Sequence, residues 1–194
     1  MRSIFAVLAT VVLAAGCATT PMPTVTEPIV DRPGQHLTRY RDRVLEVVVD
    51  TEFAQRQVGD EWIPLNVAFA GSQAKSVEID REQIWLRTPE GDRIPLPTYR
   101  EFRQRFNEIS ALTRRVALAA DPLDFSRADR RPCVLAFHPL PGTSIARDSL
   151  WVNQRELCSG IIYFAVPGGA QPGTYQLVIE LEERDVRIPF ALGR

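Results

Sequence analysis

The sequence predicts a mainly β protein, an antiparallel sandwich with one inserted amphipathic helix over about residues 98–118. Apolar and polar residues alternate in several short runs, which is the period of a half-buried strand. Turn signals rich in proline and glycine separate these runs. A single segment instead repeats its apolar residues every three or four positions, which is the period of a helix. The 194-residue chain is long enough for one domain with a sizeable core.

The clearest strands are the two that close the chain. Tyr175–Leu181 and Val186–Leu192 both alternate, and the polar residues between them predict a hairpin with one buried and one wet face. Earlier runs follow the same pattern and begin at Leu45, Ile63, Val77, Ile84 and Ile94. Shorter apolar runs occupy Cys133–Phe137 and Ile161–Val166. Many short strands separated by turns are typical of an antiparallel sandwich.

The helical segment carries one apolar stripe. Its start has the sequence of a capping box, Thr98 and Glu101, and Asp121-Pro122 closes it. The stripe consists of Tyr99, Phe102, Phe106, Ile109, Leu112 and Val116. We expect it to cover the sandwich, because a stripe at this spacing is usually core. The alternative is a helix that binds a membrane or a partner, with its other face marked by Arg100, Arg103 and Arg114.

The first residues form a segment of a different kind. Arg2 precedes an apolar run, Ile4–Ala15, that is too short for an ordinary membrane-spanning helix. The run continues into Gly16-Cys17, and this arrangement resembles the signal of bacterial lipoproteins. The resemblance implies that residues 1–16 are removed and that Cys17 is lipid-modified and anchors the chain to a membrane. The alternative is an ordinary secretory signal in which this cysteine has no role.

The residues after Cys17 predict a tether. Residues 18–34 hold four prolines and no apolar periodicity, so we expect residues 17–36 to be the lipidated cysteine and an extended linker. The sandwich domain then occupies residues 37–194. Residue 18 is Ala rather than Asp, and by resemblance to lipoprotein sorting in enterobacteria this implies an outer-membrane anchor, with the domain facing the periplasm.

Two further cysteines, Cys133 and Cys158, remain in the domain. An even pair in an exported domain favours a disulfide, although two separate buried thiols are the alternative. A metal site is not expected, because the two cysteines are far apart in sequence and the chain has only two histidines.

The charge of the chain indicates no nucleic-acid partner. Its formal net charge is −1, whereas nucleic-acid binding calls for a basic surplus. One short segment, Arg127–Arg131, is locally basic and contains Arg127, Arg130 and Arg131. We interpret it as a solvated loop, or alternatively as a contact for an anionic lipid headgroup or polysaccharide, because arginine binds anions in a bidentate manner.

No catalytic constellation is evident. His36 falls in the expected tether and His138 lies at a strand end before a proline, so neither has the setting of a catalytic base. The serines lack a nucleophile-elbow context and no phosphate loop is present. We therefore expect no enzyme, no cofactor and no metal. The alternative is an enzyme or ligand carrier with a pocket between the inserted helix and the sheet.

Several phrases of the sequence resemble immunoglobulin-like domains of telokin-like type found in bacterial envelope lipoproteins. They are Trp62–Val67, Ile84–Asp92, Gly160–Pro167 and Tyr175–Leu177, within a span of about residues 44–192. The resemblance implies a fold and a compartment, and such domains are mostly of unknown function. It departs from antibody-type domains, because Cys133 and Cys158 are too close in sequence for the usual inter-sheet pair; we expect them to staple the loop 138–157 to the sandwich. The function we expect is contact with an envelope protein or polysaccharide.

Overall fold

The computed structural model describes residues 27–117 and 129–193. The signal, Cys17, the first half of the expected tether, Arg127 and the Asp121-Pro122 helix stop lie outside the described residues. In the parts of the chain that are described, no helix is both long and apolar enough to cross a membrane.

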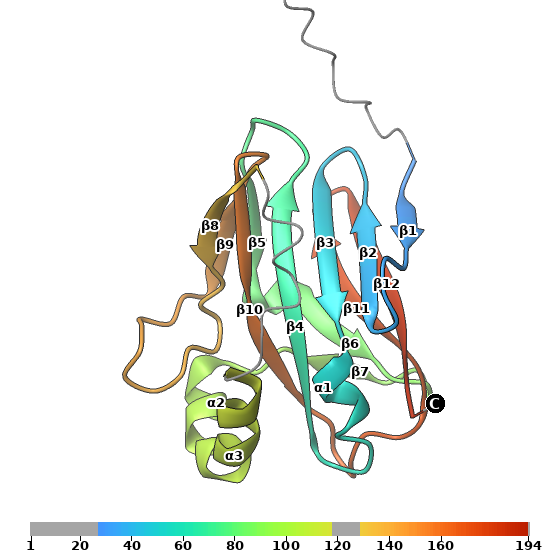
Figure 1. The fold of residues 1–194 in the computed structure, drawn as a ribbon, viewed down its shortest axis with the longest axis vertical. Coiled ribbons are helices and arrows are strands. Elements are labelled where there is room, and N and C mark those ends of the chain that lie inside the picture. The colour runs from blue at the N-terminus through green and yellow to red at the C-terminus, as the bar shows by residue number, and fades with distance from the viewer. Residues whose placement is uncertain (1–26, 118–128, 194) are drawn as a thin grey trace, which may run out of the picture.

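The fold is a mainly β sandwich, as the sequence predicts (Figure 1). A six-stranded sheet has the order β1 (Ile29–Asp31), β2 (Leu37–Arg41), β3 (Leu45–Asp50), β4 (Trp62–Gly71), β10 (Glu156–Ala165) and β8 (Arg131–Val134). Behind it lies a four-stranded sheet in the order β12 (Arg184–Leu192), β11 (Gly173–Leu181), β6 (Ile84–Arg87) and β7 (Arg93–Pro95). Two short strands, β5 (Val77–Asp80) and β9 (Ser149–Val152), pair separately.

The helical elements are short and few. They are α1 (Glu52–Gln55), the 3-10 turn η1 (Arg81–Gln83), α2 (Tyr99–Gln104) and α3 (Phe106–Ala117). Helix α1 directly follows β3, so Phe53 is helical, although its position continues the alternation of that strand.

The core lies between the two larger sheets and follows from the alternation. Val47 and Val49 of β3 are fully buried, and so are Leu177 of β11 and its two cross-strand neighbours, Leu86 and Ile188. A fully buried aliphatic side chain of this size contributes roughly 1.5–3 kcal/mol. The alternate residues of the C-terminal hairpin point away from this core and are at least partly exposed, as the predicted wet face requires, except Val178, which is buried.

The apolar stripe of the helical segment packs against the outer face of the six-stranded sheet. Phe102, Ile109, Leu112 and Val116 are buried there against Trp62 of β4 and Tyr163 of β10. The prediction that this stripe covers the sandwich is confirmed. Tyr99 and Phe106 are only partly buried.

The prediction of one continuous helix is wrong, because the segment breaks at Arg105 into α2 and α3. The Arg105 guanidinium lies 5.0 Å from the centre of the Trp62 ring and forms ion pairs with Glu61 and Glu108. Glu61 and Trp62 are far from Arg105 in the sequence, and the apolar periodicity continues across Arg105. The periodicity alone therefore does not reveal the break. The capping box at Thr98 and Glu101 is present as predicted.

Strand β8 departs from the antiparallel pattern. It pairs with β10 in parallel, and Cys133 lies directly opposite Cys158. The two cysteines form the predicted disulfide, with their Cα atoms 4.3 Å apart. The bond therefore joins two neighbouring strands, and our expectation that it staples the loop 138–157 to the sandwich is wrong. Gly160 permits the close approach, because a Cβ there would lie 2.8 Å from the carbonyl oxygen of Leu135.

One strand forms inside the segment expected to be a tether. β1 pairs with β2, and Arg39 of β2 holds Asp31 of β1 through two hydrogen bonds of 3.0 and 2.6 Å. Ordered structure thus begins before Leu37. Sequence alternation did not indicate β1, because only three residues take part in it.

Candidate functional site

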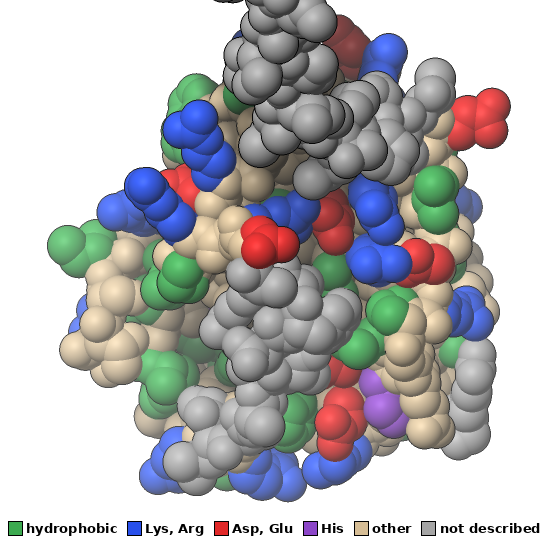
Figure 2. All heavy atoms as spheres, turned by 45° about the horizontal axis from the view of Figure 1, so that its top comes forward, with side chains coloured by type: hydrophobic (Ala, Val, Ile, Leu, Met, Phe, Trp, Pro, Cys, Tyr) green, Lys and Arg blue, Asp and Glu red, His purple; other side chains and the backbone are tan. Residues whose placement is uncertain are grey.

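Four arginines form a basic surface on α2 and α3, which we call the arginine face: Arg100, Arg103, Arg114 and Arg115. All four are exposed, because the opposite side of each helix is buried in the sandwich. Arg100, Arg103 and Arg115 form no ion pair with another described residue, and Arg114 donates to the carbonyl of Ser110 at 3.2 Å. In Figure 2, basic side chains gather along the lower edge of the molecule, where Figure 1 places these helices.

The acidic residues of these helices do not neutralise the arginine face. The carboxylate of Glu101 caps the helix by accepting from Thr98, and these hydrogen bonds lower the pKa of Glu101. Glu108 is occupied by Arg105, which donates to it at 2.8 Å and lowers the pKa of Glu108. Residues 98–117 contain five arginines and two glutamates, so this part of a nearly neutral chain has an excess of three positive charges.

Sequence reasoning identified three of these four arginines and missed Arg115. A helical projection of α3 would have found Arg115, since it lies one residue after Arg114 on the exposed side. Arg114 and Arg115 lie in the last turn of α3, where their positive charges interact favourably with the negative end of the helix dipole. They therefore have a structural role whether or not a partner binds.

The predicted basic segment before β8 is not part of this face. Arg130 forms an ion pair with Glu46 of β3 at 2.7 Å, and both side chains are largely buried, so Arg130 is a structural residue. Arg131 is exposed at the start of β8, which lies at the end of the sandwich opposite to α2 and α3 (Figure 1). Arg127 lies outside the described residues.

His138 belongs to the core that supports α2. Its Nε2–H donates to the carbonyl of Pro97 at 2.8 Å, and its Nδ1 accepts from the backbone N–H of Tyr163 at 3.2 Å. The ring stacks on Phe102 with 4.8 Å between centres. Burial lowers the pKa of His138 to about 4, so the ring is neutral at physiological pH. With both nitrogens engaged, His138 has the surroundings of a buried structural histidine.

A small cavity of about 190 Å³ lies beside α3, near the place expected for a pocket between helix and sheet. Its lining is mostly apolar and includes Leu140, Ile161 and Tyr163. Two strongly exposed apolar side chains lie in the same part of the chain, Val134 at 72% and Ile145 at 86% exposure. Most of the apolar stripe is packed directly on the sheet, so the cavity lies at the side of the helix rather than underneath it.

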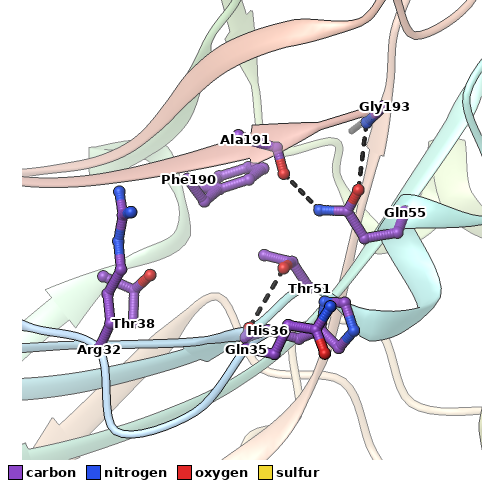
Figure 3. Close-up of a pocket in the computed structure, with 9 residues that line it drawn as sticks. All are labelled: Arg32, Gln35, His36, Thr38, Thr51, Gln55, Phe190, Ala191 and Gly193. Carbon is purple, nitrogen blue, oxygen red and sulfur yellow. Dashed lines mark hydrogen bonds between the residues drawn. The ribbon is translucent and has the colours of Figure 1, made fainter.

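A second cavity of about 230 Å³ lies where the edges of the two large sheets meet, and we call it the seam pocket (Figure 3). On one side it is lined by Thr38 of β2 and by Arg32 and His36 from the β1–β2 connection. Thr38 is only 4% exposed, yet its hydroxyl has no hydrogen-bond partner among the described residues. The Arg32 side chain is exposed and also forms no ion pair within the described chain.

Gln55 of α1 lines the opposite side of the seam pocket. Its carboxamide nitrogen donates to the carbonyl of Ala191, and its oxygen accepts from the N–H of Gly193 at 3.1 Å (Figure 3). Gln55 therefore satisfies the free edge of β12 much as a neighbouring strand would. The hydroxyl of Thr51 donates to the carbonyl of His36 at 3.2 Å, and the Phe190 ring forms an apolar wall.

The acids nearest to the seam pocket are paired with arginines or buried. Asp31 is held by Arg39, and Glu52 forms an ion pair with Arg56 at 2.6 Å. Asp50 is 3% exposed, and burial raises its pKa. None of the lining residues is acidic. No local sequence pattern indicated this pocket, since its residues come from opposite ends of the chain.

No group of three or more His, Cys, Asp or Glu side chains that could hold a metal ion occurs within residues 27–117 and 129–193. Comparison with known proteins finds no matching family model, no matching curated protein and no matching solved structure.

Proposed function

We propose that this chain is an exported lipoprotein of the cell envelope that acts by binding an anionic partner through its arginine face. Lipid on Cys17 anchors it, in the outer membrane with the domain in the periplasm. The partner is an envelope protein or polysaccharide with negative charge. The proposal assigns no catalytic step and no cofactor to the domain.

One observation carries this proposal: the arginine face and the start of the domain lie at opposite ends of the sandwich. Strand β1 enters at the top of Figure 1, and α2 and α3 lie at the bottom. Ten residues along the chain connect Cys17 to the first described residue, Glu27, a distance of at most roughly 35 Å when fully extended. A domain anchored in this way presents the arginine face away from its own membrane, toward other components of the envelope.

A contact of Tyr175 supports the immunoglobulin-like resemblance. Its hydroxyl donates to the carbonyl of Gln171 at 2.9 Å and accepts from the N–H of the same residue at 3.0 Å. A tyrosine that bonds back to the backbone a few residues upstream, near the start of a strand, is the tyrosine corner of such sandwiches. It favours a domain that serves as a scaffold for contacts.

The cavity beside α3 supports a second candidate function, a carrier of a small apolar ligand. Its volume of about 190 Å³ is below the 300–1,000 Å³ that is usual for ligand pockets, so we place this candidate second. Saturable binding of a small apolar dye that is lost in Ile161→Trp would favour it.

The anchor is tested by Cys17→Ser. We expect this variant to incorporate no radiolabelled fatty acid and to leave the membrane fraction or accumulate unprocessed, because the thiol is the site of lipid attachment in the proposal. Cys17 is the natural choice, since the other cysteines form a disulfide. Normal labelling and membrane fractionation of Cys17→Ser would refute the anchor and leave the arginine face untested by this experiment.

The arginine face is tested by site-specific photo-crosslinking in intact cells. A photoreactive residue at Ala111, which is exposed on α3, should capture a partner, whereas one at exposed Lys75 in the β4–β5 connection should not. Adding Arg103→Glu and Arg114→Glu should lower the yield at Ala111 about tenfold or more, because like charges facing a partner cost several kcal/mol. Equal yields at both positions, or a yield that survives the charge reversal, would contradict the proposal.

A further inference from the structure

We propose that the seam pocket is a binding site for a small organic anion, one with a carboxylate or phosphate group on a short apolar body. This inference goes beyond the envelope function above and does not depend on it. The pocket lies between β2, α1 and β12, on a different part of the molecule from the arginine face (Figures 1 and 3).

The charge of the seam pocket selects an anion. Arg32 is an exposed guanidinium without an acidic partner among the described residues, and a guanidinium matches a carboxylate or phosphate with two parallel hydrogen bonds. The two flanking acids, Asp31 and Glu52, are already paired with Arg39 and Arg56. The positive charge of Arg32 is thus not cancelled by the groups around it.

The hydrogen-bonding groups of the pocket fit the same ligand. The hydroxyl of Thr38 has no partner in the described structure although the residue is almost fully buried, and Figure 3 shows it beside Arg32. Gln55 uses one N–H for Ala191 and has a second N–H without a described acceptor. The Thr38 hydroxyl is not among the buried side-chain atoms that lack a partner, so it reaches the cavity and is available to donate to a ligand oxygen.

The apolar wall of the pocket indicates the chemistry of the uncharged part of the ligand. The Phe190 ring lines the cavity across from Thr51 and offers an apolar surface to a small planar or aliphatic group (Figure 3). The volume of about 230 Å³ is also below the 300–1,000 Å³ that is usual for ligand pockets, so the site admits only a very small ligand. The combination of one guanidinium, a free hydroxyl and one aromatic wall therefore describes a small amphipathic anion.

The test is isothermal titration calorimetry of the full-length protein in detergent with benzoate, phenyl phosphate and neutral benzamide. We expect saturable binding of benzoate or phenyl phosphate, whichever oxyanion the site prefers, and none of benzamide. Arg32→Gln should weaken binding at least tenfold, since hydrogen bonds to charged groups are among the strong ones. Thr38→Val keeps the shape of the side chain and should weaken binding by about two- to tenfold.

Arg43→Gln is the matched control. Arg43 is an exposed arginine in the β2–β3 connection whose only ion pair among the described residues is a 3.8 Å contact with Glu183, so its replacement should leave binding unchanged. The proposal is overturned if neither anion binds saturably, if benzamide binds equally well, or if Arg43→Gln matches the effect of Arg32→Gln. None of these results bears on lipidation or on crosslinking at Ala111.

Discussion

Replacing Phe102 with alanine should lower the free energy of unfolding by about 3–5 kcal/mol, as large aromatic truncations in cores do. Phe102 is fully buried between α2 and the sheet, 4.8 Å from the His138 ring centre and 5.1 Å from that of Tyr163. Alanine would leave a cavity that these two rings cannot fill without breaking the hydrogen bonds of His138. Urea denaturation of the purified mature protein measures the change.

The neighbouring Arg103→Glu provides the control for Phe102→Ala. Arg103 is exposed on the arginine face, so its replacement should change the free energy of unfolding by no more than about 0.5 kcal/mol. Phe106→Ala should fall between the two, because Phe106 is only partly buried. A Phe102→Ala protein as stable as wild type would show that α2 and α3 contribute little to the core, and their apolar stripe would then become a candidate contact surface.

Reduction of the Cys133–Cys158 disulfide should lower the free energy of unfolding by about 3 kcal/mol. The bond closes a loop with a sequence separation of 25, and in the chain-entropy model the loss of this constraint stabilises the unfolded chain by that amount. For a protein of this size we expect the melting temperature to fall by roughly 6–12 °C. Thermal unfolding with and without a reductant measures the shift.

The double variant Cys133→Ala/Cys158→Ala separates the effect of the bond from other effects of the reductant. It should melt near the temperature of the reduced wild type and show no further shift when the reductant is added. A wild-type protein that melts at the same temperature with and without the bond, with reduction verified by intact mass, would disprove the stabilising role.

The elements that could be predicted from the sequence are those whose own residues follow a regular apolar and polar pattern. The alternation in the β11–β12 hairpin appears as expected, with one face toward the core. Strand β4 also forms as expected, although both of its faces are buried. The helical stripe also appears, because the same side chains meet the sheet once per turn. The cysteine pair was predictable from its even count in a chain expected to be exported.

The features that were not predicted depend on residues distant in sequence. The helix breaks at Arg105, which contacts Glu61 and Trp62, and β8 pairs in parallel with β10, a strand that comes later in the chain. Strand β9 is only four residues long and includes the exposed Trp151, so its alternation is too short to recognise. The same limit applies to the candidate sites, since the sequence indicates the arginines of the helices but not a pocket that joins Thr38 to Ala191.

The position of β12 determines when the domain can become complete. This last strand supplies one wall of the core and lies beside β2, while its carbonyl at Ala191 is held by Gln55, 136 residues earlier in the chain. Contacts of such long sequence separation close slowly, because the loop entropy is lost before the contacts are gained. A nascent chain therefore lacks its complete sandwich until β12 has been synthesised, and this order agrees with the export proposed above.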